Sequence, residues 1–195
     1  MPTGVAIRDA REQLFDAAER VLLRDGPSAL TSRAVTAEAG CAKGVLHRHF
    51  ADFDAFLAEL VRDRIARIEQ QSATLHEAAG TGTVAGNLTD ALTALFGSVA
   101  VAIVGLITSR DELRARLRRT TPVGVPVLTE ATAVIASYLI AERERGRIAA
   151  GADIDTLAPM LIGTGHLLFA DRHSAPPDAG TVHKAVTAVL AGACP

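Results

Sequence analysis

The chain has 195 residues, of which 49 % are hydrophobic, 22 % charged and 4 % aromatic, and its formal net charge is −2. This apolar content is enough for one or two packed domains and excludes wholesale disorder. The near-neutral charge excludes a positive field over the whole molecule. The scarcity of aromatic rings disfavours a stacking surface for sugars or single-stranded nucleic acid.

Neither a disulfide framework nor a metal site is indicated. The two cysteines, Cys41 and Cys194, lie far apart without a CxxC, and the six histidines show no metal-ligand spacing. Asp171, His173 and Ser174 follow one another closely, but no nucleophile elbow or strand supports them, so we expect a solvated loop. We predict no catalytic residues, no enzyme activity, no metal and no cofactor. With no signal peptide visible, we expect a cytoplasmic protein.

One uncharged stretch has nearly the length of a membrane span. Residues 91–109 are 19 residues without a charge. Small and polar residues interrupt the stretch, and no aromatic residues flank it. We therefore expect a helix buried inside a larger helical domain and no membrane partner.

The first half of the chain contains four segments with helical periodicity, at residues 8–24, 32–38, 43–49 and from 52 or 53 up to 75 or beyond. Gly26 and Pro27 end the first segment, and Thr31 is placed to cap the second. Gly40 predicts a sharp left-handed turn between the second and third segments.

The second half also reads as helical, with segments at 87–107, 110–119, 122–145, 154–169 and 182–193. Residues 79–83 are typical of a domain linker. No strand alternation is visible, so the predicted fold is all-α. We place domain boundaries at residues 1–52, 53–79 and 80–195.

Residues 31–50 carry the strongest functional signal, because two short helices joined by a tight turn are typical of a helix-turn-helix that reads the DNA major groove. This segment contains three basic residues and one acidic residue, Glu38, which gives a local charge of 3 − 1 = +2. A local positive patch is what attraction to DNA phosphates requires. The structural alternative is a plain helical hairpin inside an all-α protein.

The stretches 30–35 (Leu-Thr-Ser-Arg-Ala-Val) and 38–50 (Glu-Ala-Gly-Cys-Ala-Lys-Gly-Val-Leu-His-Arg-His-Phe) resemble the DNA-binding segment of the TetR family of bacterial transcriptional regulators. The pairs at 17–18 and 56–57 also fit this family. The resemblance implies an all-α fold with an N-terminal three-helix helix-turn-helix head, a connecting fourth helix, and a helical ligand-binding and dimerisation domain. It also implies that the last two helices form the dimer interface.

Several residues of the third helix are placed for contact with double-stranded DNA. Gly44 allows close backbone approach, and Lys43 and Val45 are placed for base edges. Phosphate contacts are expected from Arg33, Arg48 and His49. His47 adds a further donor. Leu46 and Phe50 are expected to point inward.

Three positions depart from the family pattern. Ala42 replaces a capping Ser or Thr, His47 replaces a Tyr, and Phe53 replaces a Lys. In the family these positions often contact phosphates, so the operator or the affinity is expected to be unusual. Cys41 replaces an apolar residue and is expected to be a small buried hydrophobe, with redox sensing as the alternative.

The C-terminal domain is expected to hold a pocket for a small-molecule effector with mostly apolar walls. Its candidate lining residues are Phe96, Val99, Ile103, Tyr138 and His166. The alternative for each is simple core packing. The basic segment 110–119 favours a solvated face, with packing near the head or binding of an anionic ligand as alternatives.

A homodimer is expected because apolar stripes on the last two helices would be exposed in a monomer. The candidate interface residues are Leu157, Leu161, Gly165, Leu168, Val182, Val186, Val189 and Leu190. We therefore predict a ligand-responsive repressor that binds a palindromic operator as a homodimer and is released by a hydrophobic small molecule. The alternatives are a helical small-molecule-binding protein with impaired DNA binding, or an enzyme on a helical scaffold.

Overall fold

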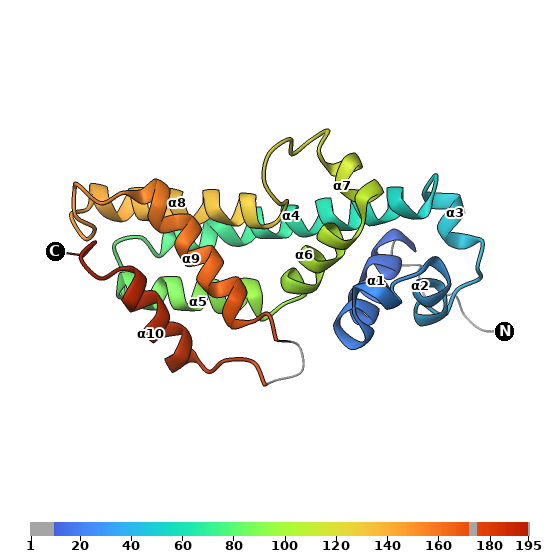
Figure 1. Ribbon diagram of the computed structural model, residues 1–195, viewed down its shortest axis with the longest axis horizontal. Helices are drawn as coiled ribbons and strands as arrows, with labels where there is room; N and C mark the ends of the chain where they lie inside the picture. Colours follow the sequence, from blue (N-terminus) through green and yellow to red (C-terminus); the bar gives the residue numbers. More distant parts are fainter. Residues whose placement is uncertain (1–9, 172–174, 195) are drawn as a thin grey trace. The chain divides into compact units, whose positions relative to one another are not determined.

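The computed structural model describes residues 10–171 and 175–194, and every regular element in these ranges is a helix (Figure 1). The all-α prediction is therefore confirmed. The described chain forms two compact units, one containing residues up to 62 together with 102–123, the other containing 63–101 together with 124 onward. The sequence-based boundaries at 52 and 79 differ from this division, because no local pattern reveals that 102–123 pack with the N-terminal helices.

The first unit is built on α1 (Ala10–Asp25), the 3-10 turn η1 (Pro27–Ala29), α2 (Ser32–Glu38), α3 (Val45–His49) and the start of α4 (Phe53–Glu77). Three aromatic rings meet in its core. The centroid of Phe50 lies 5.9 Å from that of Phe15 and 5.0 Å from that of Phe56. Leu14, Leu22, Leu30, Val35, Leu46, Leu57 and Leu60 are buried with them.

Local signals in the sequence fix the corners of this unit. The Thr31 hydroxyl accepts a hydrogen bond from the Ala34 amide at 3.1 Å, which confirms the predicted cap. Gly40 has φ +65°, as the predicted left-handed turn requires. The third helix is shorter than predicted and begins at Val45, whose amide donates to the Ala42 carbonyl in the preceding turn at 2.9 Å.

Helix α6 (Ala100–Ser109) and helix α7 (Asp111–Leu117) bring the second stretch of chain into the first unit. Arg110 donates to the Leu30 carbonyl at 2.9 Å, and Arg116 donates to Asp52 at 2.9 Å. A fully solvated basic face is therefore wrong for these two arginines. The alternative of packing near the head is the one that the structure shows.

The second unit contains the rest of α4 with α5 (Val84–Phe96), α8 (Leu128–Glu144), α9 (Ile154–Leu168) and α10 (Ala179–Val189). Helix α9 packs on α5, α8 and α10, and α10 also packs on α5. Residues 79–83 lie within this unit. Arg147 donates to the Thr81 and Gly82 carbonyls, so this segment is a pinned turn rather than the predicted domain linker.

The predicted helix 87–107 is two helices, because the chain breaks at residues 97–99. The Ser98 hydroxyl donates to the Leu95 carbonyl at 2.5 Å and accepts from the Ala100 amide at 3.4 Å. A serine that bonds to nearby backbone groups competes with the helix ladder. Within the described ranges no single helix is long and apolar enough to span a membrane. Only the broken pair α5 and α6 together reaches that length and composition.

Two other helices start away from the predicted positions. Helix α8 begins at Leu128 rather than at 122, because Pro126 and the positive φ of Val127 (+78°) precede it. The Glu130 carboxylate then accepts from the Val127 amide at 2.7 Å. Helix α10 begins three residues earlier than predicted, because Asp178 accepts from the Thr181 amide at 2.7 Å and caps it.

Candidate functional site

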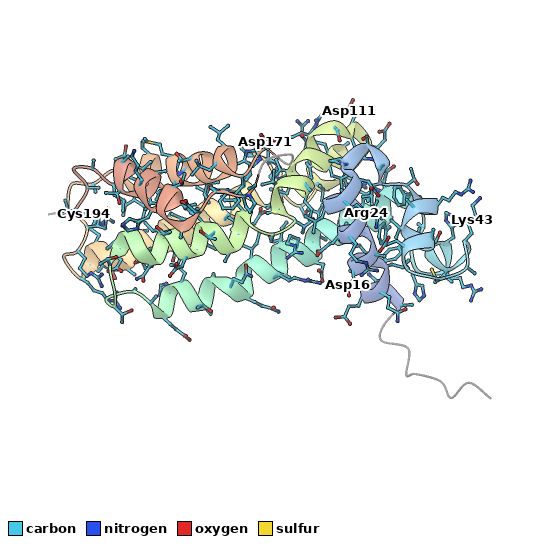
Figure 2. All side chains as sticks on the ribbon, turned by 90° about the horizontal axis from the view of Figure 1, so that it is seen from below. Asp16, Arg24, Lys43, Asp111, Asp171 and Cys194 are labelled. Atoms are coloured by element: carbon cyan, nitrogen blue, oxygen red, sulfur yellow. The ribbon has the colours of Figure 1, made fainter. Side chains whose placement is uncertain are left out.

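The outer surface of α2, α3 and the turn between them carries the basic side chains singled out from the sequence. Arg33, Lys43, His47, Arg48 and His49 are all exposed, and Figure 2 shows Lys43 extending from this turn. None of the three long cations makes an ion pair with another described residue. They are therefore available to an external anion.

The one acid in this segment is already neutralised by α1. Arg20 contacts one Glu38 oxygen at 2.7 Å, and Arg24 contacts the other at 2.9 Å. Hydrogen bonds from Arg20 and Arg24 hold the pKa of the Glu38 carboxyl below its ordinary value. Glu38 therefore does not oppose the cations of α2 and α3, and the local field of this surface is positive.

Buried apolar side chains anchor α3 to the core of the first unit. Leu46 is fully buried and Phe50 is buried, as predicted, and the Arg11 guanidinium lies over the Phe50 ring at 4.8 Å from its centroid. Val45 is half-buried and Gly44 is exposed. A Cβ added at Gly44 would meet nothing within 4 Å, so this surface is open to a close neighbour.

The three departures from the family pattern have visible consequences. Gly44 is the N-cap of α3, and with Ala42 two residues before it the helix has no side-chain cap. Phe53 is engaged in packing, because its ring stacks on Phe56 and lies under Arg110. His47 is exposed and remains available as a donor. Cys41 is half-buried rather than buried.

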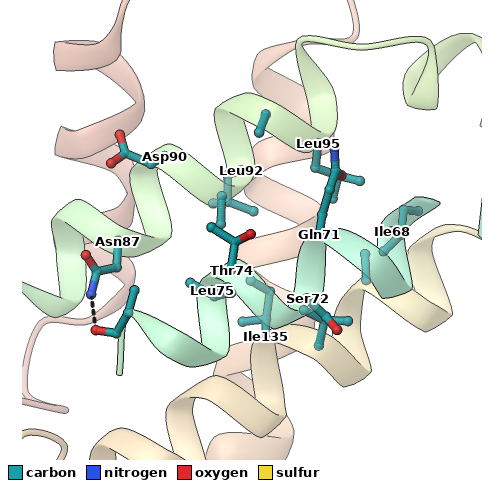
Figure 3. Close-up of a pocket in the computed structure, with 15 residues that line it drawn as sticks. Ile68, Gln71, Ser72, Thr74, Leu75, Asn87, Asp90, Leu92, Leu95 and Ile135 are labelled. Atoms are coloured by element: carbon teal, nitrogen blue, oxygen red, sulfur yellow. Dashed lines mark hydrogen bonds between the residues drawn. The ribbon is translucent and has the colours of Figure 1, made fainter. Parts of the chain in front are cut away.

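The second unit contains a cavity of about 320 Å³ (Figure 3). Its walls come from α4, α5 and α8, and Ile68, Leu75, Leu92, Leu95 and Ile135 give them an apolar character. The polar and charged residues at its edge are Gln71, Ser72, Thr74, Asn87 and Asp90. A small, mostly apolar cavity with a few polar groups suits a small organic molecule.

None of the five residues predicted for the pocket lines this cavity. Phe96, Val99, Ile103 and Tyr138 are at most 2 % exposed and fill the cores of their units. Their helices are amphipathic, and an apolar stripe alone does not distinguish a core position from a cavity wall. Tyr138 reaches the cavity only indirectly, because it accepts from the amide of Asn87 at 3.0 Å.

His166 is half-buried beside Phe96, with ring centroids 6.0 Å apart. Burial lowers the pKa of His166, so the neutral imidazole is favoured there. Its Nε2 atom is buried and has no hydrogen-bond partner among the described residues. It therefore packs against Phe96 within the second unit and is not part of the cavity wall.

The residues predicted for a dimer interface face mostly inward. Leu161, Gly165, Val182, Val186 and Leu190 are buried within a single chain. Leu157, Leu168 and Val189 are half-buried. The large apolar side chains that α9 leaves exposed are instead Met160, at 48 %, and Leu167, at 75 %. The sequence missed these two because α9 is apolar on more than one face.

No group of three or more His, Cys, Asp or Glu side chains within 10–171 and 175–194 is arranged to hold a metal ion. Of the sequence cluster at 171–174, His173 and Ser174 lie outside the described residues, and Asp171 is exposed.

Comparisons with known proteins agree with the geometry of the first unit. Residues 14–60 match the family model of bacterial regulatory proteins, tetR family. This range contains α2, α3 and most of α1. No curated protein matches the chain.

Several solved structures share the fold over nearly the whole chain. A TetR-family transcriptional regulator from Agrobacterium tumefaciens is 15 % identical, with 95 % of this chain and 98 % of that one covered and a TM-score of 0.73. The fatty acid degradation regulator FadR from Bacillus halodurans is 18 % identical, with 98 % of each chain covered and a TM-score of 0.70. FadR from Bacillus subtilis in complex with stearoyl-CoA is 20 % identical, with 93 % and 98 % covered and a TM-score of 0.67.

Proposed function

We propose that the chain is a cytoplasmic, ligand-responsive transcriptional repressor of the tetR family of bacterial regulatory proteins, whose family model matches residues 14–60. The observation that carries the proposal is the exposed, unopposed set of cations on α2, α3 and the turn between them. In this proposal Lys43, Val45 and the backbone at Gly44 meet base edges. Arg33, Arg48 and the two histidines bind phosphates and set the register.

Recognition of a palindromic operator requires two copies of α3, about 34 Å apart in successive major grooves. The proposed repressor therefore acts as a homodimer. Its interface uses the outward stripe of α9 formed by Met160, Gly163 and Leu167, which recur at helical spacing and are all exposed. Exposed apolar side chains on one helical face are best covered by a second copy of the same face.

The cavity of the second unit is the proposed effector site. A bound ligand shifts the population toward dimers whose two α3 helices no longer match successive grooves, and the operator is released. The relative from Bacillus subtilis was solved with stearoyl-CoA, a ligand with a long apolar chain. The apolar walls here support an effector that is also largely apolar.

Selection of bound sequences from a random DNA duplex pool, at two salt concentrations, tests the proposal. Recovery of one palindrome at both salts is the expected result, and it also supplies the operator for release assays. Weak retention without sequence preference that vanishes at the higher salt contradicts sequence-specific repression.

A second candidate is a helical small-molecule-binding protein with impaired DNA binding. The favouring observation is that α3 has five residues and no side-chain cap, while Phe53 is committed to packing. Loss of a capping hydroxyl costs about 1 kcal/mol of helix stability. This candidate predicts ligand binding by the cavity together with failure of the selection experiment.

A further inference from the structure

The cavity wall contains a single ionisable residue, and that residue is acidic. Of its 15 lining residues, ten are apolar, four are neutral and polar, and only Asp90 is ionisable. No Lys, Arg or His lines this cavity. An anionic ligand placed there would face one carboxylate and no counter-charge, whereas a cation would be attracted to Asp90.

Asp90 itself has no competing partner. It lies on α5 and is exposed, and its side chain makes no ion pair or hydrogen bond with any other residue in the described ranges. In Figure 3 it is drawn one turn from Asn87 on the same helix. Its carboxylate points away from the other lining side chains in Figure 3, so it is placed to pair with a cationic group at the rim of the cavity rather than inside it.

The neutral polar side chains of the cavity wall offer few free hydrogen-bond donors to an anion. The Asn87 amide nitrogen already donates to the Ala78 carbonyl at 3.1 Å and to the Thr81 carbonyl at 3.0 Å. The Ser72 hydroxyl donates to the Glu69 carbonyl at 2.5 Å. Of the lining residues, Gln71 and Thr74 remain to offer side-chain donors, and neither carries a charge.

We propose that this cavity takes an apolar molecule that bears one cationic group, with the cation paired to Asp90. The proposal rests on the proposed function in treating the cavity as the effector site. It distinguishes this chain from the relative solved with stearoyl-CoA, because the phosphates of coenzyme A call for basic side chains that this cavity does not have.

Three probes with one hydrocarbon chain and different head groups test the proposal: octylamine, 1-octanol and octanoate. Their dissociation constants are measured by calorimetry at pH 7 on the full chain, at low and high salt. We expect octylamine to bind about tenfold more tightly than octanoate at low salt, with 1-octanol between them and the difference shrinking as salt rises.

Two variants and a control locate the effect. Asp90→Asn weakens octylamine about two- to fivefold and leaves 1-octanol unchanged, because only the charge pair is lost. Ala94→Trp, at an exposed lining position, weakens all three probes by filling the cavity. Glu144→Gln removes an exposed charge on α8 outside the cavity and changes none of them.

Equal binding of octylamine and octanoate, or tighter binding of octanoate, overturns the proposal. So does an unchanged octylamine affinity in Asp90→Asn. These results leave the DNA selection experiment untouched, because the probes are measured without DNA. Failure of the selection with a clear preference for octylamine would overturn repression and keep the cationic ligand.

Discussion

At the scale of single residues, Gly165 shows how tightly the second unit is packed. A Cβ added at this position would lie 2.6 Å from Cε2 and 2.8 Å from Cδ2 of Phe96, well inside van der Waals contact. The glycine lets α9 approach α5 at this point, and the Phe96 ring fills the space that a side chain would take. Gly165 therefore contributes to close packing inside one chain.

Gly165→Ala is accordingly expected to destabilise the protein by about 1–3 kcal/mol, since overpacking forces the ring or the helix to move. Urea unfolding followed by circular dichroism measures the change. In a Phe96→Leu background the added methyl has room, so the same substitution should cost less there. Equal costs in both backgrounds would rule out the Phe96 overlap as the cause.

Arg48 makes the DNA proposal testable at one side chain. It is exposed on α3 and has no partner among the described residues, so its removal leaves the fold intact. Arg48→Ala should weaken operator binding about tenfold at low salt and reduce the slope of log K against log salt by about one. Fluorescence anisotropy over a salt series gives both quantities.

The matched control is Arg145→Ala in the second unit, where the guanidinium donates to the Ala141 carbonyl. It should change neither affinity nor salt slope. A loss of affinity for Arg48→Ala with an unchanged salt slope would contradict a phosphate contact.

At the scale of elements, α7 is attached to the head through Arg110. This side chain donates to the Leu30 carbonyl, lies 3.7 Å from an Asp54 oxygen, and covers the Phe53 ring. Arg110→Ala should destabilise the protein by about 1–2 kcal/mol, because it leaves the Leu30 carbonyl without this donor. Thermal unfolding measures the effect.

The control is Arg118→Ala, at an exposed position of the same segment, which should change the free energy of unfolding by less than about 0.5 kcal/mol. Equal effects of the two substitutions would contradict the anchoring role of Arg110.

Elements whose boundaries depend on local chemistry were predictable from the sequence. The cap at Thr31 and the left-handed turn at Gly40 involve residues within a few positions of each other, and the structure confirms both. The break at Ser98 was missed because it lies in an uncharged stretch where apolar periodicity continues on both sides. The start of α8 was missed because it depends on a positive φ at Val127, an unfavourable backbone for a β-branched residue.

At the scale of the whole molecule, contacts between residues far apart in the sequence could not be predicted. Arg116 meets Asp52 across 64 positions, and no local pattern announces that pair. The cavity was misplaced for the same reason, since its walls combine α4, α5 and α8, which are far apart in sequence. The exposure of the side chains proposed to contact DNA needed no long-range information, because α2 and α3 are adjacent and one turn sets their geometry.

The outward stripe of α9 supports the last prediction, which concerns the assembly. Leu167 is 75 % exposed within one chain, and a dimer through α9 would bury it. Leu167→Glu places a charge in that interface, and burying an unpaired charge is strongly unfavourable. Sedimentation equilibrium should therefore give the mass of one chain for Leu167→Glu and of two chains for the parent.

The operator affinity of Leu167→Glu should also fall, because each half-site needs its own copy of α3. Val123→Glu, at a 78 % exposed position outside α9, should stay dimeric and bind the operator normally. A dimeric Leu167→Glu protein would show that another face joins the two copies.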